Sequence, residues 1–122
     1  MLEQRSANGE TALALQLNDA RELTAKAAEA ARLLAALANE HRLAILCTLV
    51  EGERSVGTLV EAVGLTQSAL SQHLAKLRAA GIVATRRDAQ TIYYRIASAA
   101  AGSVMKTLAD IYCGGESHKT SH

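Results

Sequence analysis

The two cysteines are the residues of this chain best suited to covalent or metal chemistry. Cys47 and Cys113 are the only ones among 122 residues. A permanent disulfide is rare in a reducing compartment, where we expect this chain to reside. Three interpretations stay open from the residues alone: inert core thiols, metal ligands or a redox-active pair.

Metal binding has little support from the residues near these thiols in the sequence. Two thiolates fall short of the four ligands that a structural zinc ion takes. The last predicted helix adds Asp110, but Tyr112 stands where an imidazole would be needed, and we interpret His118 and His122 as residues of a polar tail. We therefore predict no metal and no cofactor.

A run of short polar side chains between residues 66 and 78 is typical of a helix that reads DNA. Such a helix buries one face in its own domain and offers hydrogen-bonding side chains to base edges, with basic residues nearby for phosphates. The leucines at 70, 74 and 77 form the face expected to be buried. We expect base or phosphate contacts from Gln67, Ser68, Ser71, Gln72 and His73, with Thr66, Lys76 and Arg78 as phosphate or supporting residues.

The elements that would position these residues are mostly helical. We predict a helix from its N-cap Asp19 to residue 37, a second capped by Asn39 with Cys47 on its inward face, and short and long helices capped by Ser55 and Thr66. Gly64 and Gly81 end the last two, which gives a helix-turn-helix. A last helix is expected over about 98–113, ending at Cys113.

Between the last two helices the apolar period changes to two, which predicts a β-hairpin over 82–96. Its turn lacks Asn-Gly or Gly, so we expect a loop wider than two residues. Arg86, Arg87 and Gln90 at its tip are further candidates for DNA contact. The predicted fold is a mainly helical winged helix-turn-helix domain over 19–113, with an N-terminal arm at 1–18 and a polar tail at 114–122.

Charge and hydropathy support a polyanionic partner. The net charge is only +1, but residues 66–95 hold five Lys or Arg against one acidic residue. No apolar run approaches the roughly 18 residues of a membrane span, and the N-terminus lacks the order of a signal peptide, so we expect a cytoplasmic protein without membrane contact. Neither a phosphate-binding loop nor a nucleophile elbow is present, so we predict no enzyme activity.

Three stretches resemble the arsenic-repressor (ArsR) family of winged-helix regulators: LLAALANEHRLAIL at 33–46, QSALSQHLAKLRAAGIV at 67–83 and YYRI at 93–96. The resemblance covers roughly residues 25–113. It implies a homodimer joined by the first long helix and the last helix. Such a dimer would bind an imperfect palindrome in double-stranded operator DNA and release it when an inducer arrives.

The inducer is indicated by a finer resemblance. Metal-sensing relatives carry a cysteine box where this chain has Ser55-Val56-Gly57-Thr58-Leu59, without a thiolate or imidazole. The cysteine positions instead resemble the sulfide- and persulfide-responsive branch, the biofilm growth-associated repressor type. That likeness implies that reactive sulfur species join Cys47 and Cys113 by a disulfide or a longer sulfur chain.

The helix dipole disfavours a thiolate at Cys113, so we expect Cys47 to react first, aided by a nearby cation. Two alternatives stay open: a repressor that responds to metals or general thiol oxidants, and a winged-helix module that binds protein.

Overall fold

The computed structural model describes residues 18–113, so most of the predicted arm and all of the predicted tail lie outside the described residues. The chain divides into two compact units, Met1–Leu34 and Ala35–His122. In the first unit residues 18–25 are helical, and a turn at Lys26 precedes α2 (Ala27–Leu37), which runs into the second unit. The prediction of Asp19 as an N-cap is wrong, because Asn18 before it is already helical.

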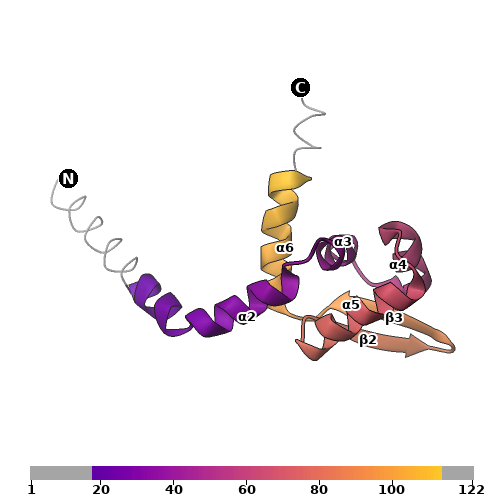
Figure 1. Ribbon diagram of the computed structural model, residues 1–122, viewed down its shortest axis with the longest axis horizontal. Helices are drawn as coiled ribbons and strands as arrows, with labels where there is room; N and C mark the ends of the chain where they lie inside the picture. The colour runs from indigo at the N-terminus through magenta and orange to yellow at the C-terminus, as the bar shows by residue number, and fades with distance from the viewer. Residues whose placement is uncertain (1–17, 114–122) are drawn as a thin grey trace, which may run out of the picture. The chain divides into compact units, whose positions relative to one another are not determined.

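The second unit contains the remaining elements, coloured from purple to yellow in Figure 1. They are α3 (Glu40–Leu49), β1 (Arg54–Ser55), α4 (Val56–Val63), α5 (Gln67–Ala79), β2 (Val83–Asp88), β3 (Thr91–Ile96) and α6 (Ala99–Tyr112). The mainly helical fold with a hairpin wing is the one predicted. No helix of the described residues is both long and apolar enough to cross a membrane.

Side-chain caps fix where these helices begin. The predicted caps Asn39, Ser55 and Thr66 are confirmed, and Ser98 caps α6 in the same way. Each oxygen accepts a hydrogen bond from a backbone N–H of the first helical turn that has no intrahelical partner. Short local signals therefore set the start of four consecutive helices.

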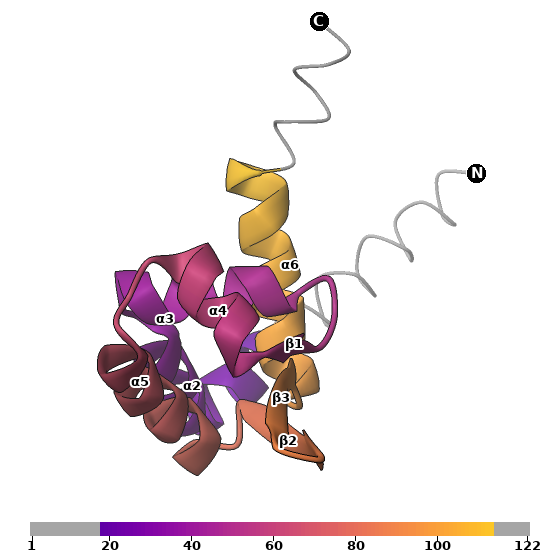
Figure 2. The ribbon, with the colours of Figure 1, turned by 90° about the vertical axis from the view of Figure 1, so that its right-hand side faces the viewer.

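Helix α3 is the centre of the second unit. It contacts α4, α5, α6 and β3, and Figure 2 shows these elements gathered around it. Its buried residues Ile45, Leu46 and Leu49 meet a core built from the neighbouring elements, whose buried members are Leu59, Leu70, Leu74, Leu77, Ile82, Val83, Ala101 and Met105. The predicted leucine stripe of α5 is thus confirmed as its inner face.

The turn between α4 and α5 requires glycine. Gly64 adopts the left-handed conformation, with φ of 76°, and its N–H donates to the Val60 carbonyl. A side chain at that φ would be strained, whereas glycine reaches it freely. This turn sets the angle at which α5 leaves α4.

The wing is a sheet of three strands in the order β1-β3-β2, not the hairpin alone. The short strand β1 pairs with β3 through Arg54 opposite Tyr94 and Ser55 opposite Tyr93. Nothing in the sequence pattern indicated β1, since two residues are too few to show a period. The extra strand attaches the wing to the connection that follows α3.

The hairpin turn is tight, and the prediction of a wider loop is wrong. Asp88 pairs with Thr91, so only Ala89 and Gln90 form the loop. Ala89 has a φ of 57° and is the only described non-glycine residue with positive φ. A positive φ at the first loop residue alone belongs to a type II′ turn, whose twist suits a hairpin. The strand register therefore imposes on alanine a conformation that glycine prefers.

Replacing this alanine should stabilise the protein. We expect Ala89→Gly to raise the free energy of unfolding by roughly 0.5–1 kcal/mol, because relief of the left-handed strain exceeds the entropy that glycine adds to the unfolded chain. Ala84→Gly, within β2, is the matched control and should destabilise by a similar amount. Chemical denaturation measures both, and a loss of stability in Ala89→Gly would contradict the assignment of strain to this turn.

Candidate DNA-binding surface and cysteine pair

Helix α5 presents two different faces. Its leucines at 70, 74 and 77 are buried, whereas the predicted contact residues Gln67, Ser68, Ser71, Gln72, Lys76 and Arg78 are all exposed. The Thr66 hydroxyl accepts a hydrogen bond from the Ala69 N–H at 3.1 Å and so supports the start of the helix. The exposed face combines hydrogen-bonding side chains and cations, the combination that contact with a nucleic acid requires.

His73 lies differently from the other candidates on α5. It is half-buried, its ring centroid lies 5.5 Å from that of His41 on α3, and its Nδ1 atom is buried without a hydrogen-bond partner. Removal from water lowers the pKa of the His73 imidazole, and the positive charges of Arg42, His41 and Lys76 lower it further. His73 therefore contributes to the packing of α5 on α3.

The wing and the start of α5 share a concave surface. A recess of about 430 Å³ is lined by the first residues of α4, by Gln67 of α5 and by Gln90, Thr91 and Ile92 of the wing. Two predicted contact residues from different elements, Gln67 and Gln90, thus border one hollow. Arg87 is exposed on the wing, and no ion pair involves it within the described part of the chain.

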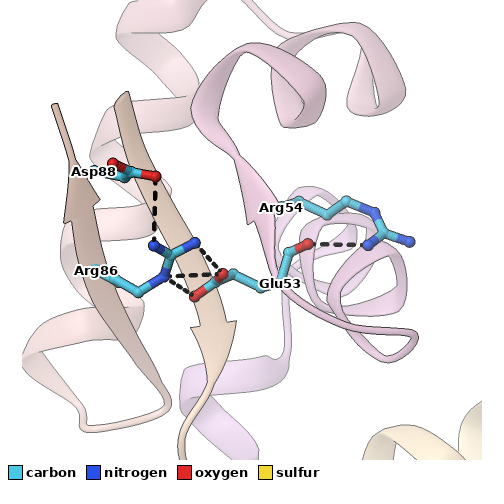
Figure 3. A network of polar contacts seen from close by, with 4 residues as sticks. All are labelled: Glu53, Arg54, Arg86 and Asp88. Atoms are coloured by element: carbon cyan, nitrogen blue, oxygen red, sulfur yellow. Dashed lines mark hydrogen bonds and ion pairs between the residues drawn. The ribbon is translucent and has the colours of Figure 1, made fainter. Parts of the chain in front are cut away.

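Arg86 has a partner inside the protein. Its guanidinium forms an ion pair with Glu53, which precedes β1, at 2.7 Å, and lies 3.9 Å from Asp88 (Figure 3). It also lies over the ring of Tyr93, 4.5 Å from the centroid. Hydrogen bonding with Arg86 lowers the pKa of Glu53 and raises that of Arg86, so the pair stays charged at neutral pH.

The two cysteines come together where α3 meets α6. Cys113 follows the last residue of α6 as its C-cap, and Cys47 lies on α3. Burial raises the pKa of the Cys47 thiol most, and Cys113 is near enough to raise it further. Both are free and exposed, so the expectation that Cys47 points inward is wrong. The buried face of α3 runs through Ile45, Leu46 and Leu49 instead.

The surroundings of Cys47 do not favour its thiolate. Partial removal of the sulfur from water raises its pKa most, followed by the Cys113 thiol and the negative charge of Glu51. None of these influences is the cation that we expected to assist Cys47. The arrangement places a second sulfur near the first and favours the protonated form of Cys47.

Metal-ligating groups do not cluster in the described region. Between residues 18 and 113 no three His, Cys, Asp or Glu side chains lie close enough together to hold a metal ion. Asp110 and Tyr112 are exposed on α6, and His118 and His122 lie outside the described residues.

A three-stranded wing beside a helix-turn-helix, with a polar exposed face on the second helix, defines the winged helix-turn-helix class. The model of the family described as "Bacterial regulatory protein, arsR family" matches residues 39–85. The chain belongs to this family, as its relatives below also show.

The relatives include proteins named as transcriptional regulators. The chain is 58% identical over 83 residues to the nodulation protein NolR of Rhizobium meliloti, covering 68% of each protein. It is 48% identical over 92 residues to the transcriptional activator HlyU of Vibrio cholerae, covering 75% of this chain and 85% of HlyU. Reduced HlyU has also been solved, and it matches with a TM-score of 0.73 at 47% identity over 76% of this chain and 98% of that chain.

The biofilm growth-associated repressor of Xylella fastidiosa is 46% identical over 91 residues, covering 75% of this chain and 80% of the repressor. Its crystal structure matches with a TM-score of 0.72 at 44% identity, over 76% of this chain and 95% of that chain. The resemblance to this type of ArsR-family regulator is therefore confirmed.

Sequence reasoning missed Glu53, Tyr93 and His41 as partners of the candidate residues. Glu53 and Arg86 are 33 positions apart and His41 and His73 are 32 apart, so no local period connects them. The sequence indicates that Tyr93 and Arg95 share one face of β3. Which residue of β2 lies opposite Tyr93 depends on the strand register, which the sequence does not indicate.

The lowered pKa of His73 predicts weaker stability in acid. The unfolded chain accepts a proton near pH 6.5, above the pKa of His73 in the folded protein, so the free energy of unfolding should fall as the pH drops below about 6.5. His73→Gln should show a shallower fall between pH 7 and 5, measured by urea denaturation. An unchanged pH dependence in His73→Gln would contradict this account.

Glu51 should slow the reaction of Cys47. Removing its charge in Glu51→Gln should lower the pKa of the Cys47 thiol and speed its alkylation at pH 7.5 by roughly two- to threefold. Peptide mass spectrometry of iodoacetamide-treated protein gives the rate at Cys47 itself. Glu61→Gln, an exposed residue of α4, is the control, and equal rates in the two variants would exclude a local effect of Glu51.

Proposed function

We propose that the chain is a homodimeric repressor that binds double-stranded operator DNA through α5 and the wing. The carrying observation is the split of α5 into a buried leucine face and an exposed face of Gln, Ser, Lys and Arg. A helix of this kind fits the major groove, where each base pair presents a distinct pattern of donors and acceptors. Gln67, Ser68, Ser71 and Gln72 are the proposed reading residues, and Lys76, Arg78 and Arg87 the proposed phosphate contacts.

Dimerisation is proposed through the first helical region and α6. Each carries large apolar side chains that are exposed in the single chain: Leu23 and Leu34 in the first, Ile111 and Tyr112 in α6. Exposed apolar groups of this size are typical of an interface. A two-fold dimer presents two copies of α5 to half-sites one DNA turn apart, about 34 Å, which matches an imperfect palindrome.

Cys47 and Cys113 are the proposed sensor of reactive sulfur species. A thiolate attacks the outer sulfur of a persulfide RSSH and becomes a persulfide itself, with RSH leaving. The second thiol attacks the inner sulfur of that group, which forms the disulfide and releases H₂S. The two thiols are oxidised and the incoming sulfur is reduced, and longer sulfur chains would form from polysulfides.

Three observations support the sensor. Cys113 is near enough to Cys47 to raise the pKa of its thiol, both cysteines are exposed, and α3 packs against both α6 and α5. A covalent bond between α3 and α6 therefore acts on α3, the helix against which the proposed reading helix α5 packs. A coupling of roughly 1–3 kcal/mol would change operator affinity about 5–150-fold.

Phosphate contacts make a direct test of DNA binding. The affinity for an operator duplex should fall linearly on a logarithmic salt scale, and Arg87→Gln should reduce that slope by about 1. Fluorescence anisotropy with a labelled duplex provides the measurement. Binding that is independent of salt, or absent, would favour a module that binds protein.

Serine variants test the sensor. Persulfide should release wild-type protein from the operator, whereas Cys47→Ser and Cys113→Ser should bind DNA when untreated and stay bound after treatment. Parallel arms with hydrogen peroxide and with zinc separate the sulfur-responsive mechanism from its oxidant- and metal-responsive alternatives. Undiminished release of both variants by persulfide would rule out the cysteine pair as the sensor.

A further inference from the structure

The contact between Glu53 and Arg86 is geometrically the strongest side-chain interaction of the wing. The Arg86 Nε–H is shared between both carboxylate oxygens of Glu53 at 3.1 Å each, and the Nη2 group donates to Oε1 at 2.7 Å. Such two-pronged pairs are directional, unlike most surface ion pairs. Figure 3 shows the two side chains pointing at each other, Arg86 from β2 and Glu53 from the segment just before β1.

The strand register explains why the two side chains meet. Tyr93 on the central strand β3 pairs with Ser55 of β1 on one side and with Arg86 of β2 on the other. Residues directly opposite each other share a face of the sheet, and so do residues two apart on one strand. Glu53 comes directly before β1, two residues ahead of Ser55, and from there its carboxylate reaches the Arg86 guanidinium, which lies over the Tyr93 ring.

The Glu53–Arg86 pair connects the segment after α3 to the wing, and both take part in the proposed mechanism. Glu53 belongs to the connection between α3, which carries Cys47, and β1. Arg86 belongs to the outer strand β2 of the wing. Arg87, next to it in the same strand, points to the opposite face and has no ion-pair partner among residues 18–113.

We propose that Glu53 and Arg86 are positioning residues, which fix the wing to the connection after α3, and that Arg86 is not itself a phosphate contact. The inference rests on the proposed binding of operator DNA. The wing then approaches DNA in the orientation that α3 dictates, and Arg87 provides its phosphate contact. The charge of Arg86 is satisfied within the protein by the Glu53 carboxylate and by the face of Tyr93.

Two substitutions of Arg86 separate positioning from phosphate contact, because one keeps the positive charge and the other removes it. Arg86→Lys keeps the charge but loses the planar fork that matches a carboxylate. We expect it to weaken operator binding about fivefold or more, as much as Arg86→Gln does, with the slope of affinity against salt unchanged in both variants. If Arg86→Lys binds like wild type while Arg86→Gln loses about 1 from the slope, Arg86 is a phosphate contact and the proposal is overturned.

Glu53→Gln provides the opposite charge change. Removing an anion near DNA should tighten binding if charge alone matters, whereas loss of the anchor should weaken it about fivefold or more despite the gain in positive charge. Glu61→Gln is the matched control, since it removes the same charge from an exposed residue of α4. The double variant Glu53→Gln/Arg86→Lys should bind no more weakly than either single variant. Binding by Glu53→Gln equal to or tighter than that of Glu61→Gln would overturn the proposal.

A measurement without DNA keeps the two hypotheses separate. By NMR, the Arg86 Nε–H should exchange slowly with water in the wild-type protein and rapidly in Glu53→Gln, with thermal unfolding showing both folded. Rapid exchange in the wild type would overturn the proposal that Glu53 holds Arg86 in place. If the wild type fails to bind the operator while this proton exchanges slowly, the proposed function fails and the contact stands.

Discussion

The burial of α3 is the constraint on which the rest of the structure depends. Ile45 and Leu46 are fully buried, and the helix contacts α4, α5, α6 and β3 together. Because protein interiors are close-packed, a displacement of α3 is transmitted to its neighbours and not absorbed by empty space. The helix that carries the candidate reading residues and the helix that ends at Cys113 therefore share one support.

Charge is arranged around the C-terminal end of that support. Burial raises the pKa of Cys47 most, and the charge of Glu51 adds to it; Glu53, two residues further on, binds Arg86 of the wing. Arg54, the next residue, lies 3.6 Å from Glu51 and begins β1. Seven residues from Cys47 to Glu53 thus connect the sulfur pair to the wing. In the proposed mechanism, a bond formed at Cys47 acts on DNA contacts through this short path as well as through the packing of α5.

Most of the fold could be predicted because its signals are local. The caps Asn39, Ser55 and Thr66 and the leucines of α5 act within one or two turns of helix. The errors arose where distant parts of the chain decide. Helical spacing on α3 allowed Cys47 to lie on the inward face, but packing by four neighbouring elements buried Ile45, Leu46 and Leu49 instead. The tight turn at Ala89 follows from strand register, which the loop residues alone did not indicate.

The candidate site could be predicted residue by residue but not in its contacts. The exposed face of α5 follows from its buried face, whereas the roles of Arg86 and His73 depend on partners more than 30 residues away. The nearness of the two thiols likewise depends on how α3 and α6 pack, and only the family resemblance indicated it from the sequence.

The most direct test of the account asks whether persulfide joins the two cysteines within one chain. Dimers assembled from ¹⁵N-labelled and unlabelled chains would be treated with persulfide, digested without reduction and analysed by mass spectrometry. The account predicts Cys47 and Cys113 peptides linked by two or more sulfurs, always with both peptides labelled or both unlabelled. Linked peptides of mixed label, or cysteine peptides that remain unlinked while DNA is released, would contradict it.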